Sequence, residues 1–404
     1  MGCGMTFASP FLATLESRGF IRQLTDAGAL DAAAAEGMIT GYIGFDCTGP
    51  SLHIGHLVSI MMLRHLQAAG HRPIVVMGGG TTKVGDPSGK DDARPLLDDA
   101  AIAANMASIR TAFERFVVFG DGPSDAVMVN NDDWLSTISY VPFLREIGRH
   151  FSINRMLTFD SVRLRLDREQ PLSFLEFNYM IVQAYDFLEL NRRFGCVLQM
   201  GGSDQWGNIV GGADLIRRVE GRQAWGLTTP LITRADGSKM GKTAAGAVWL
   251  NRDLLPDFDY WQLWRNTDDR DVARFLKLFT DLSLAEIDGV MAGDINAAKV
   301  RLATEATALC RGQEAADAAA ATAAATFGGG AGEALPKFAV AEPVTILDAL
   351  VGLGFAASKG EARRLVAGGG ARVDGEAVVD EGVMVGPGGK VSAGKKRHGL
   401  IIAV

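Results

Sequence analysis

The stretch from residue 40 to residue 59, TGYIGFDCTGPSLHIGHLVS, constrains the fold of this chain more than any other. Its first half is a β-prone apolar run, and its second half has the apolar spacing of a helix, for which Ser51 is the expected N-cap. Residues 48–51 form the break between the two. A helix that begins just beyond a strand presents free N–H groups and the positive end of its dipole. The stretch therefore predicts an anion-binding site at the carboxyl end of this strand, beside the N-terminus of the helix.

Two histidines follow this break. His53 and His56 are three residues apart, which places both side chains on one side of the first helical turn. Imidazoles in this position can donate hydrogen bonds to phosphate oxygens. The alternative is that both are ordinary polar residues beside a turn, and the stretch by itself does not decide between the two interpretations.

A second strand-like run with a glycine-rich loop comes next in the chain. Residues 73–77 (PIVVM) are apolar and β-prone, and residues 78–90 (GGGTTKVGDPSGK) are rich in Gly, Thr and Lys. The order of strand, glycine-rich turn and helix thus occurs twice, which is typical of a parallel α/β sheet. In such sheets, ligands bind beyond the carboxyl ends of the strands.

Two further stretches combine apolar patterns with polar residues. Residues 173–190 predict a helix, on which Tyr179, Gln183 and Asp186 share one face. Because buried polar groups need partners, these three side chains either satisfy one another or face a ligand. Residues 230–243 predict a strand followed by a loop rich in Gly, Lys and Thr. That loop is either a mobile phosphate clamp or a solvated surface loop.

The composition bounds the class of protein. With 404 residues, 48% of them hydrophobic, the chain has room for two or three domains and a large core. No apolar run is long enough to span a membrane. The four cysteines lie far apart, which argues against a zinc site or a disulfide framework and favours a reducing, cytoplasmic location. The N-terminal MGCGMT fits the myristoylation pattern, but so short a pattern often arises by chance, and Met5 is an alternative start.

The C-terminal part differs from the rest. Residues 315–325 contain nine alanines, and three glycines follow at 328–330, which predicts a helix and then a linker over residues 326–342. The net charge of the whole chain is −7, yet residues 343–404 hold eight Lys and Arg against six Asp and Glu. A mildly basic tail on an acidic body weakly favours contact between the tail and a polyanion.

Five motifs in order along the chain resemble those of a known family. HIGH (53–56) and KMGKT (239–243) resemble the two ATP-binding signatures of class I aminoacyl-tRNA synthetases, although the second departs from the usual KMSKS form. GDPSGK (85–90), NYMIVQAYDF (178–187) and LQMGGSDQWGN (198–208) narrow the resemblance to the bacterial tyrosyl-tRNA synthetases, over nearly the whole chain. The tail, with SKGEARRLVAGGGARVDG at 358–375, resembles a small RNA-binding fold named after a ribosomal small-subunit protein.

The resemblance implies an architecture of several parts. We expect an α/β fold with a Rossmann-like parallel-sheet catalytic domain (1–250) that binds ATP and tyrosine. A helical domain (251–325), the linker (326–342) and a small α+β RNA-binding domain (343–404) follow. The resemblance also implies a homodimer that uses the surface near residues 130–170. The spacing of Phe143, Ile147, Phe151 and Ile153 allows an apolar patch there.

The resemblance further implies roles for individual residues. Those expected to bind the phenol, the ammonium or the carboxylate of the substrate tyrosine are Tyr42, Asp86, Tyr179, Gln183, Asp186 and Gln205. Those expected to act on the phosphates and the departing pyrophosphate are Thr48, His53, His56, Lys90, Arg94, Lys239, Lys242 and Thr243, with Ser59 nearby. Those expected at the ribose and the adenylate are Asp46, Gly55, Gly202 and Asp204. Those expected to contact RNA are Lys359, Arg363, Arg364, Lys395, Lys396 and Arg397.

The implied reaction has two steps. The tyrosine carboxylate attacks the α-phosphate of ATP, and a terminal ribose hydroxyl of the tRNA then takes the tyrosyl group. A carboxylate is already ionised at pH 7, so the first step needs orientation and stabilisation of phosphate charge rather than a general base. Mg²⁺ accompanies ATP and is carried mainly by its phosphates. No protein-bound metal or prosthetic group is expected, and the partners are L-tyrosine, ATP and tyrosine tRNA.

Two alternatives belong to other functional classes. The chain could be a tryptophanyl-type synthetase, against which Tyr42 and Asp186 argue because they suit a phenol. It could also be an RNA-binding protein derived from a synthetase that has lost catalysis. The presence of both histidines of HIGH and of Lys239 argues against that second alternative.

Overall fold

The structure is a computed structural model that describes residues 6–86, 97–238, 240–243, 246–327, 335–394 and 397–403. Five residues with predicted roles lie outside these ranges: Lys90, Arg94, Lys239, Lys395 and Lys396. Residues Met1 to Met5, with the possible lipidation site and the alternative start, also lie outside them. For Lys242 and Thr243 the backbone is described and the side chain is not.

A six-stranded sheet in the order β1-β6-β5-β2-β3-β4 forms the centre of the N-terminal part. Its strands are β1 (Gln23–Leu24), β2 (Thr40–Asp46), β3 (Arg72–Gly78), β4 (Val127–Asn130), β5 (Leu198–Gly202) and β6 (Trp225–Thr229). All neighbouring pairs run parallel except β1 and β6. β2 has β3 on one side and β5 on the other, so the chain changes direction across the sheet at β2. The prediction of a parallel α/β sheet is confirmed, and ligand sites in such sheets lie at this switch point.

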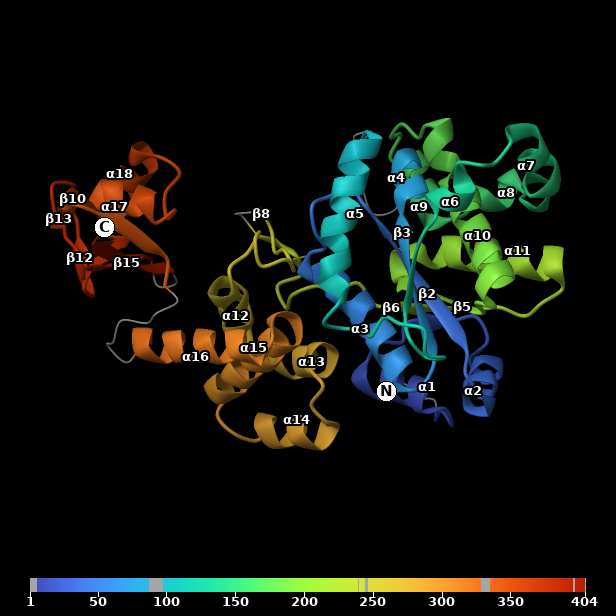
Figure 1. The fold of residues 1–404 in the computed structure, drawn as a ribbon, viewed down its shortest axis with the longest axis horizontal. Coiled ribbons are helices and arrows are strands. Elements are labelled where there is room, and N and C mark those ends of the chain that lie inside the picture. Colours follow the sequence, from blue (N-terminus) through green and yellow to red (C-terminus); the bar gives the residue numbers. More distant parts are fainter. Residues whose placement is uncertain are drawn as a thin grey trace. The chain divides into compact units, whose positions relative to one another are not determined.

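Helices cover both faces of the sheet, as Figure 1 shows. On one side lie α3 (Ile54–Ala68) and α5 (Asp99–Phe113), and on the other lie α10 (Phe174–Phe194) and α11 (Trp206–Glu220). Successive residues of β2 alternate between the two sides. Phe45 packs edge-on against Phe113 of α5, whereas Tyr42 packs against Phe187 of α10.

Short helices fill the connections of this part. Before β2 lie α1 (Pro10–Arg18) and α2 (Ala27–Glu36), and β3 leads directly into α4 (Gly79–Val84). Between β4 and α10 the chain forms α6 (Asp132–Leu135), α7 (Tyr140–Glu146), α8 (Ile153–Met156) and α9 (Asp160–Asp167). α10 begins as its sequence predicts, with Ser173 and Glu176 in a reciprocal capping box.

One local prediction is wrong. The N-cap of α3 is His53, and Ser51 lies outside the helix. The Ser51 hydroxyl is instead hydrogen-bonded to Asn251, at 2.8 Å, so it is not available to cap the helix. The helix therefore starts at Ile54, and both histidines of the HIGH motif belong to its cap.

Helices dominate the middle of the chain, which contains α12 (Asp257–Arg265), α13 (Asp269–Phe279), α14 (Leu284–Met291), α15 (Ile295–Arg311) and α16 (Gln313–Phe327). Two compact units emerge from the contacts within the chain. The first contains residues 1–256 and 264–310, and the second contains residues 257–263 and 311–404. Within the described residues, no helix is both long and apolar enough to cross a membrane.

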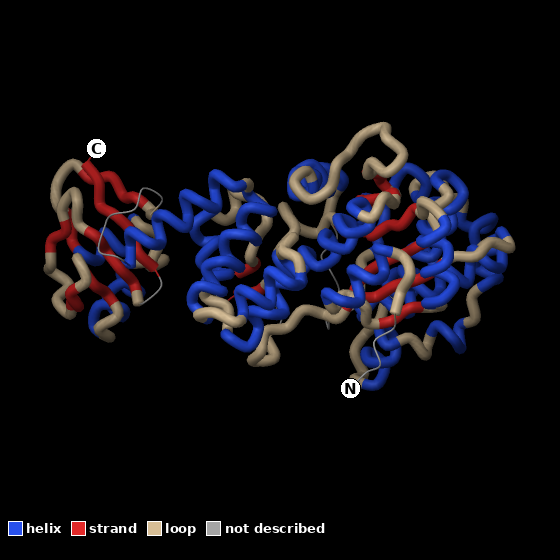
Figure 2. The backbone as a smooth tube through the Cα atoms, turned by 90° about the horizontal axis from the view of Figure 1, so that it is seen from below, coloured by secondary structure: helices blue, strands red, loops and turns tan. Residues whose placement is uncertain are grey.

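The C-terminal part of the second unit has a hydrophobic core of its own, formed by residues between Val340 and Ile401. Two helices, α17 (Ile346–Gly352) and α18 (Lys359–Ala367), accompany a five-stranded sheet in the order β12-β11-β14-β15-β9. Its strands, drawn red at the C-terminal end of the tube in Figure 2, are β9 (Lys337–Val340), β11 (Ala371–Val373), β12 (Glu376–Val378), β14 (Lys390–Ala393) and β15 (Arg397–Ala403). β9 lies within the stretch that the sequence predicted as linker and pairs parallel to β15. Two short pairs, β10 (Val344–Thr345) with β13 (Met384–Val385) and β7 (Lys242–Thr243) with β8 (Gly246–Ala247), complete the strands.

Candidate functional site

An open space lies on the α10 side of β2, in the middle of the sheet. Tyr42, Gly44 and Asp46 face this side because side chains of a strand alternate. Gly44 is exposed although its strand is central, and a Cβ atom added to it meets no atom within 4 Å. A glycine here leaves room beside the sheet for a small ligand. No role for Gly44 could be predicted from the sequence, because a glycine inside a strand does not reveal which side chains surround it in the fold.

Tyr42 closes one end of this space. Tyr42 is 2% exposed, and its hydroxyl has no hydrogen-bond partner among the residues that the structure describes. Burial, together with the nearby carboxylate of Asp186, raises the pKa of Tyr42 well above its ordinary value, so the hydroxyl stays protonated. A buried hydroxyl without a partner is costly for a folded protein unless a ligand supplies one.

Asp186 is held by two N–H donors from the segment that follows β4. Its Oδ1 accepts from Trp134 Nε1 at 2.7 Å, and its Oδ2 accepts from Asn131 Nδ2 at 2.9 Å. Burial raises its pKa to about 7, although these two hydrogen bonds favour the ionised form. Asn131 in turn bonds Gly80 and Thr81 of α4, so the carboxylate has a fixed orientation. Sequence reasoning assigned no role to Asn131 or Trp134, which position Asp186.

The three polar side chains that share one face of α10, Tyr179, Gln183 and Asp186, are not paired with one another. Tyr179 donates its hydroxyl to Asp46 Oδ2 at 3.1 Å, at the carboxyl end of β2, and Thr81 donates to Asp46 Oδ1 at 2.7 Å. Within the described part of the chain, the buried side-chain oxygen of Gln183 has no hydrogen-bond partner. Tyr179 and Asp186 thus have partners on other elements, and the interpretation that this row faces a ligand stays a prediction.

A second polar group lies at the end of β5. Gln205 donates to Asp86 Oδ2 at 3.0 Å and accepts from Asn208 at 3.0 Å. Asp204 is exposed in the short turn after β5, next to Gly202. The residues predicted for the ammonium, the carboxylate and the ribose are thus placed along the carboxyl ends of β2 and β5, on both sides of the switch point.

The two histidines of HIGH stack on each other at the N-terminus of α3. Their ring centroids are 4.0 Å apart, at an interplanar angle of 29°. His53 Nδ1 accepts from the Gly55 N–H at 3.1 Å, and His56 Nδ1 accepts from the His53 N–H at 3.2 Å. Because both Nδ1 atoms are acceptors, each neutral ring carries its proton on Nε2. The pair can therefore present two N–H donors, in addition to the helix terminus, to an anion.

The KMGKT loop lies directly against this helix terminus. The Ile54 N–H donates to the Val248 carbonyl at 2.9 Å, and the Val248 N–H donates to the Gly241 carbonyl at 3.0 Å. Gly241 has a φ of +108°, and a Cβ atom there would lie 2.9 Å from His53 Nδ1. Serine, which the usual form of the motif has at this position, does not fit this conformation. The close approach places the two signature motifs side by side.

The predicted RNA-binding residues that the structure describes belong to the tail. Lys359 pairs with Asp348, and Arg363 pairs with Glu381. Arg397 donates to the Phe355 carbonyl at 2.6 Å. Arg364 is exposed on α18, and its guanidinium takes part in none of the side-chain hydrogen bonds or ion pairs found among the described residues. Part of the positive charge in the tail is therefore neutralised within the tail itself.

Comparison with known proteins decides the family. The model of the family described as tRNA synthetases class I (W and Y) matches residues 34–328. The chain belongs to this family. The synthetase is 66% identical over 403 residues to a tyrosine–tRNA ligase of Novosphingobium aromaticivorans, with 98% of each chain covered. It is 61% identical over 405 residues to a tyrosine–tRNA ligase of Zymomonas mobilis, with 98% of this chain and 99% of that one covered.

A solved structure agrees with these sequence matches. A C-terminally truncated mitochondrial tyrosyl-tRNA synthetase from Aspergillus nidulans matches this synthetase with a TM-score of 0.70 and 30% sequence identity. The match covers 77% of this chain and 92% of that one. The family and the α/β fold class predicted from the motifs are confirmed.

Proposed function

We propose that this synthetase is a tyrosine–tRNA ligase, which activates L-tyrosine with ATP and then transfers the tyrosyl group to the 3′ end of tyrosine tRNA. The observation that carries the proposal is the buried pair of Tyr42 and Asp186 beside the open space at Gly44. A phenol hydroxyl can donate to the Asp186 carboxylate and accept from the Tyr42 hydroxyl. The identity of 66% to a relative named tyrosine–tRNA ligase supports the same substrate.

The same pair argues against other amino acids. Phenylalanine would leave both polar groups unpaired, a form of selectivity for which tyrosyl-tRNA synthetases are themselves the established example. Tryptophan has an indole N–H that donates and cannot accept, so it would leave the Tyr42 hydroxyl without an acceptor for its proton. The tryptophanyl alternative therefore fits this pocket less well than tyrosine does.

For the activation step, we propose that the site works by positioning and charge stabilisation. The Asp86–Gln205 pair and the Tyr179–Asp46 pair, which lie at the strand ends, orient the ammonium and the carboxylate of tyrosine. His53 and His56 meet the phosphates at the N-terminus of α3, where N–H groups and the dipole add to their donors. Thr48, Lys90, Arg94, Lys239, Lys242 and Thr243 hold the phosphates and the departing pyrophosphate. Gly55, Gly202 and Asp204 bind the remainder of ATP.

Magnesium enters this proposal as part of MgATP. The carboxylates at the strand ends already accept hydrogen bonds from protein donors: Asp46 from Thr81 and Tyr179, and Asp86 from Gln205. These contacts leave the phosphate oxygens as the main ligands for Mg²⁺, which commonly binds to proteins through one or two carboxylates and substrate phosphates. The ion would add to the neutralisation of charge on the triphosphate.

We also propose that the synthetase is a homodimer. Exposed apolar side chains concentrate between residues 140 and 175, with Tyr140 62%, Val141 71%, Ile153 64% and Phe174 70% exposed. An apolar surface of this kind is typical of an interface. Of the residues expected in the patch, Ile147 is buried and Phe143 and Phe151 pack against the core, so the patch is built mostly from other side chains. Sedimentation equilibrium at micromolar concentration tests the dimer.

The tail completes the proposal. We propose that residues 343–404 form the RNA-binding domain that contacts tyrosine tRNA, with residues 1–250 as the catalytic domain, 251–325 as the helical domain and 326–342 as the linker. The separate core between Val340 and Ile401 supports an independent tail. We also propose a cytoplasmic location, which the resemblance to bacterial tyrosine–tRNA ligases supports.

ATP–pyrophosphate exchange, measured with each amino acid in turn, tests the function. We expect exchange with tyrosine alone. Exchange with tryptophan would identify a tryptophanyl enzyme, and no exchange with any amino acid, combined with binding of tRNA, would identify a protein that has lost catalysis.

A further inference from the structure

The segment just before the KMGKT loop folds into a tight turn. The Arg234 N–H donates to the Ser238 carbonyl at 2.8 Å, and the Met240 N–H donates to the Ile232 carbonyl at 3.1 Å. Asp236 accepts from both the backbone and the hydroxyl of Ser238. The turn therefore fixes the backbone position of Met240 and Gly241, which lie against the HIGH motif.

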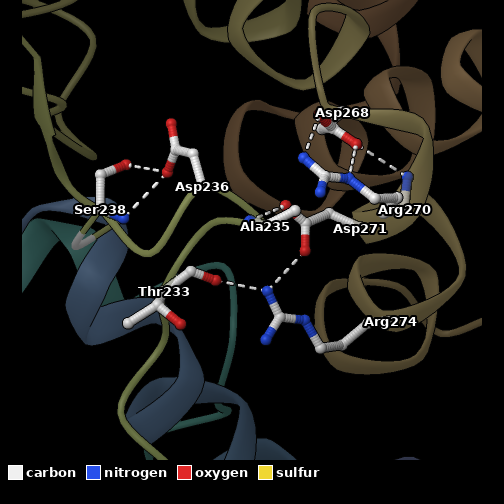
Figure 3. A network of polar contacts seen from close by, with 8 residues as sticks. All are labelled: Thr233, Ala235, Asp236, Ser238, Asp268, Arg270, Asp271 and Arg274. Carbon is white, nitrogen blue, oxygen red and sulfur yellow. Dashed lines mark hydrogen bonds and ion pairs between the residues drawn. The ribbon is translucent and has the colours of Figure 1, made fainter.

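Two side chains of α13 hold this turn from outside, as Figure 3 shows. Asp271 Oδ2 accepts from the Ala235 N–H at 2.7 Å, and Arg274 donates to the Thr233 carbonyl. Asp271 and Arg274 also pair with each other at 2.6 Å. One carboxylate and one guanidinium thus fix two peptide groups of the turn in a closed ring of hydrogen bonds. We call this ring the α13 clamp.

The clamp is strong because its carboxylate is shielded from water. Asp271 is 4% exposed, and hydrogen bonds to a charged group are stronger than those between neutral groups, more so in a low local dielectric. Removing the charge leaves the Ala235 N–H with a weaker acceptor and Arg274 without its ion pair. The Thr233 to Ala235 segment then loses its fixed attachment.

α13 is itself fixed relative to the HIGH helix. It packs against α3 and α1, with Val272, Phe275, Leu276 and Phe279 buried. At its C-terminal end, the guanidinium of Arg18 donates to the carbonyls of Lys277, Thr280 and Leu282. The helix that carries the clamp is therefore anchored to the helix whose terminus carries His53 and His56.

We propose that Asp271 and Arg274 are positioning residues for ATP activation. They set the place of Met240 and Gly241 against the helix terminus that carries His53 and His56, and thereby the arrangement of the two ATP-binding motifs. The proposal deepens the proposed function and rests on it for its catalytic readout. Neither residue lies in a signature motif, and neither contacts the predicted substrate residues within the described part of the chain.

The α13 helix also offers a matched control. Arg270 pairs with Asp268 in the same turn of the helix, at 2.9 Å, and both side chains are well exposed. Figure 3 shows this pair beside the clamp, with no hydrogen bond or ion pair drawn from it to the turn. Arg270→Ala removes the same kind of charge at the same helix end while leaving the clamp intact.

The test compares Asp271→Asn, Arg274→Ala, Arg274→Lys and Arg270→Ala in the full-length protein. In ATP–pyrophosphate exchange, we expect Asp271→Asn and Arg274→Ala to lower kcat/KM for ATP by about 10- to 100-fold, because small displacements of positioning groups are costly. The dissociation constant for tyrosine without ATP should stay within about twofold, since the tyrosine pocket lies on other elements. Arg274→Lys should recover part of the loss, and Arg270→Ala should match the wild type.

Hydrogen exchange gives a readout that does not depend on activity. The amides of Ala235 and Met240 should exchange faster in Asp271→Asn and Arg274→Ala, and not in Arg270→Ala. Unchanged exchange, unchanged ATP kinetics, or an equal loss of tyrosine and ATP affinity would overturn the proposal. If the wild type showed no tyrosine-dependent activity, the proposed function would fail, and the amide exchange would still decide whether the clamp holds the loop.

Discussion

Replacing Gly241 with alanine places a methyl group where the two signature motifs meet. The added Cβ would lie 2.9 Å from His53 Nδ1 and 3.1 Å from the Gly55 nitrogen, and φ at this position is +108°. A non-glycine residue in such a strained conformation costs about 1–3 kcal/mol. At about 1.4 kcal/mol for each factor of ten, this corresponds to a reduction of roughly 5- to 150-fold in the population of the docked loop.

The amide of Val248 reports this population directly, because its N–H donates to the Gly241 carbonyl. We expect its hydrogen exchange in Gly241→Ala to accelerate by roughly 5- to 150-fold, provided that exchange proceeds through opening of the loop. The rate of ATP–pyrophosphate exchange should fall in the same variant, while the dissociation constant for tyrosine should not change.

Gly221→Ala is the control, since Gly221, at the C-terminal end of α11, has a φ of +66° but no atom within 4 Å of an added Cβ. It carries backbone strain without the close approach. If Val248 exchanged at the wild-type rate in Gly241→Ala, or equally fast in both variants, the reasoning about docking at Gly241 would be refuted.

Three further predictions concern other parts of the molecule. His53→Ala should slow adenylate formation by about 10²–10³ with nearly unchanged tyrosine affinity, since one preorganised donor is lost; a pre-steady-state rate within about threefold of the wild type would contradict this. Asp186 has its pKa raised from 3.8 to about 7 by burial, so the folded state binds a proton that the unfolded state releases, and its contribution to stability declines as pH rises from about 4 to 7. The Tm of Asp186→Asn, measured relative to the wild type, should therefore rise between pH 5 and pH 8, and a constant difference would argue against the shift. Deletion of residues 336–404 should leave adenylate formation intact, abolish most tRNA charging and flatten its salt dependence; loss of adenylate formation would show that the body needs the tail.

Local patterns in the sequence predicted most of the secondary structure. In the tail, α17 and α18 each follow a capping residue that is visible in the sequence, Thr345 and Ser358, which accepts from the backbone of its own helix. Ser51 has the same chemistry but a different outcome, since its hydroxyl bonds Asn251, which lies 200 residues away in sequence. A side chain caps a helix only if it bonds the helix backbone in preference to other partners. When the preferred partner is distant in sequence, the local sequence does not reveal it.

The candidate site could be predicted from the sequence only in part. The row of Tyr179, Gln183 and Asp186 could be recognised from its spacing, yet the donors that hold Asp186 come from the segment after β4. The apolar spacing of residues 143–153 also pointed to a surface patch, whereas Ile147 turns into the core. Periodicity shows which residues share a face, and only the packed fold shows what that face meets.

The position of β2 between β3 and β5 has a consequence for synthesis of the chain on the ribosome. β3 follows β2 closely, but the other edge of β2 is covered only by β5, which begins at Leu198. At about 5–20 residues per second, the ribosome needs roughly 8–30 s to make the intervening residues. During this time an apolar parallel edge that includes Tyr42 stays unpaired, and unpaired strand edges are templates for association with other chains. The nascent chain is therefore most exposed to aggregation and most dependent on chaperones before residue 198 emerges, and its tyrosine pocket forms late.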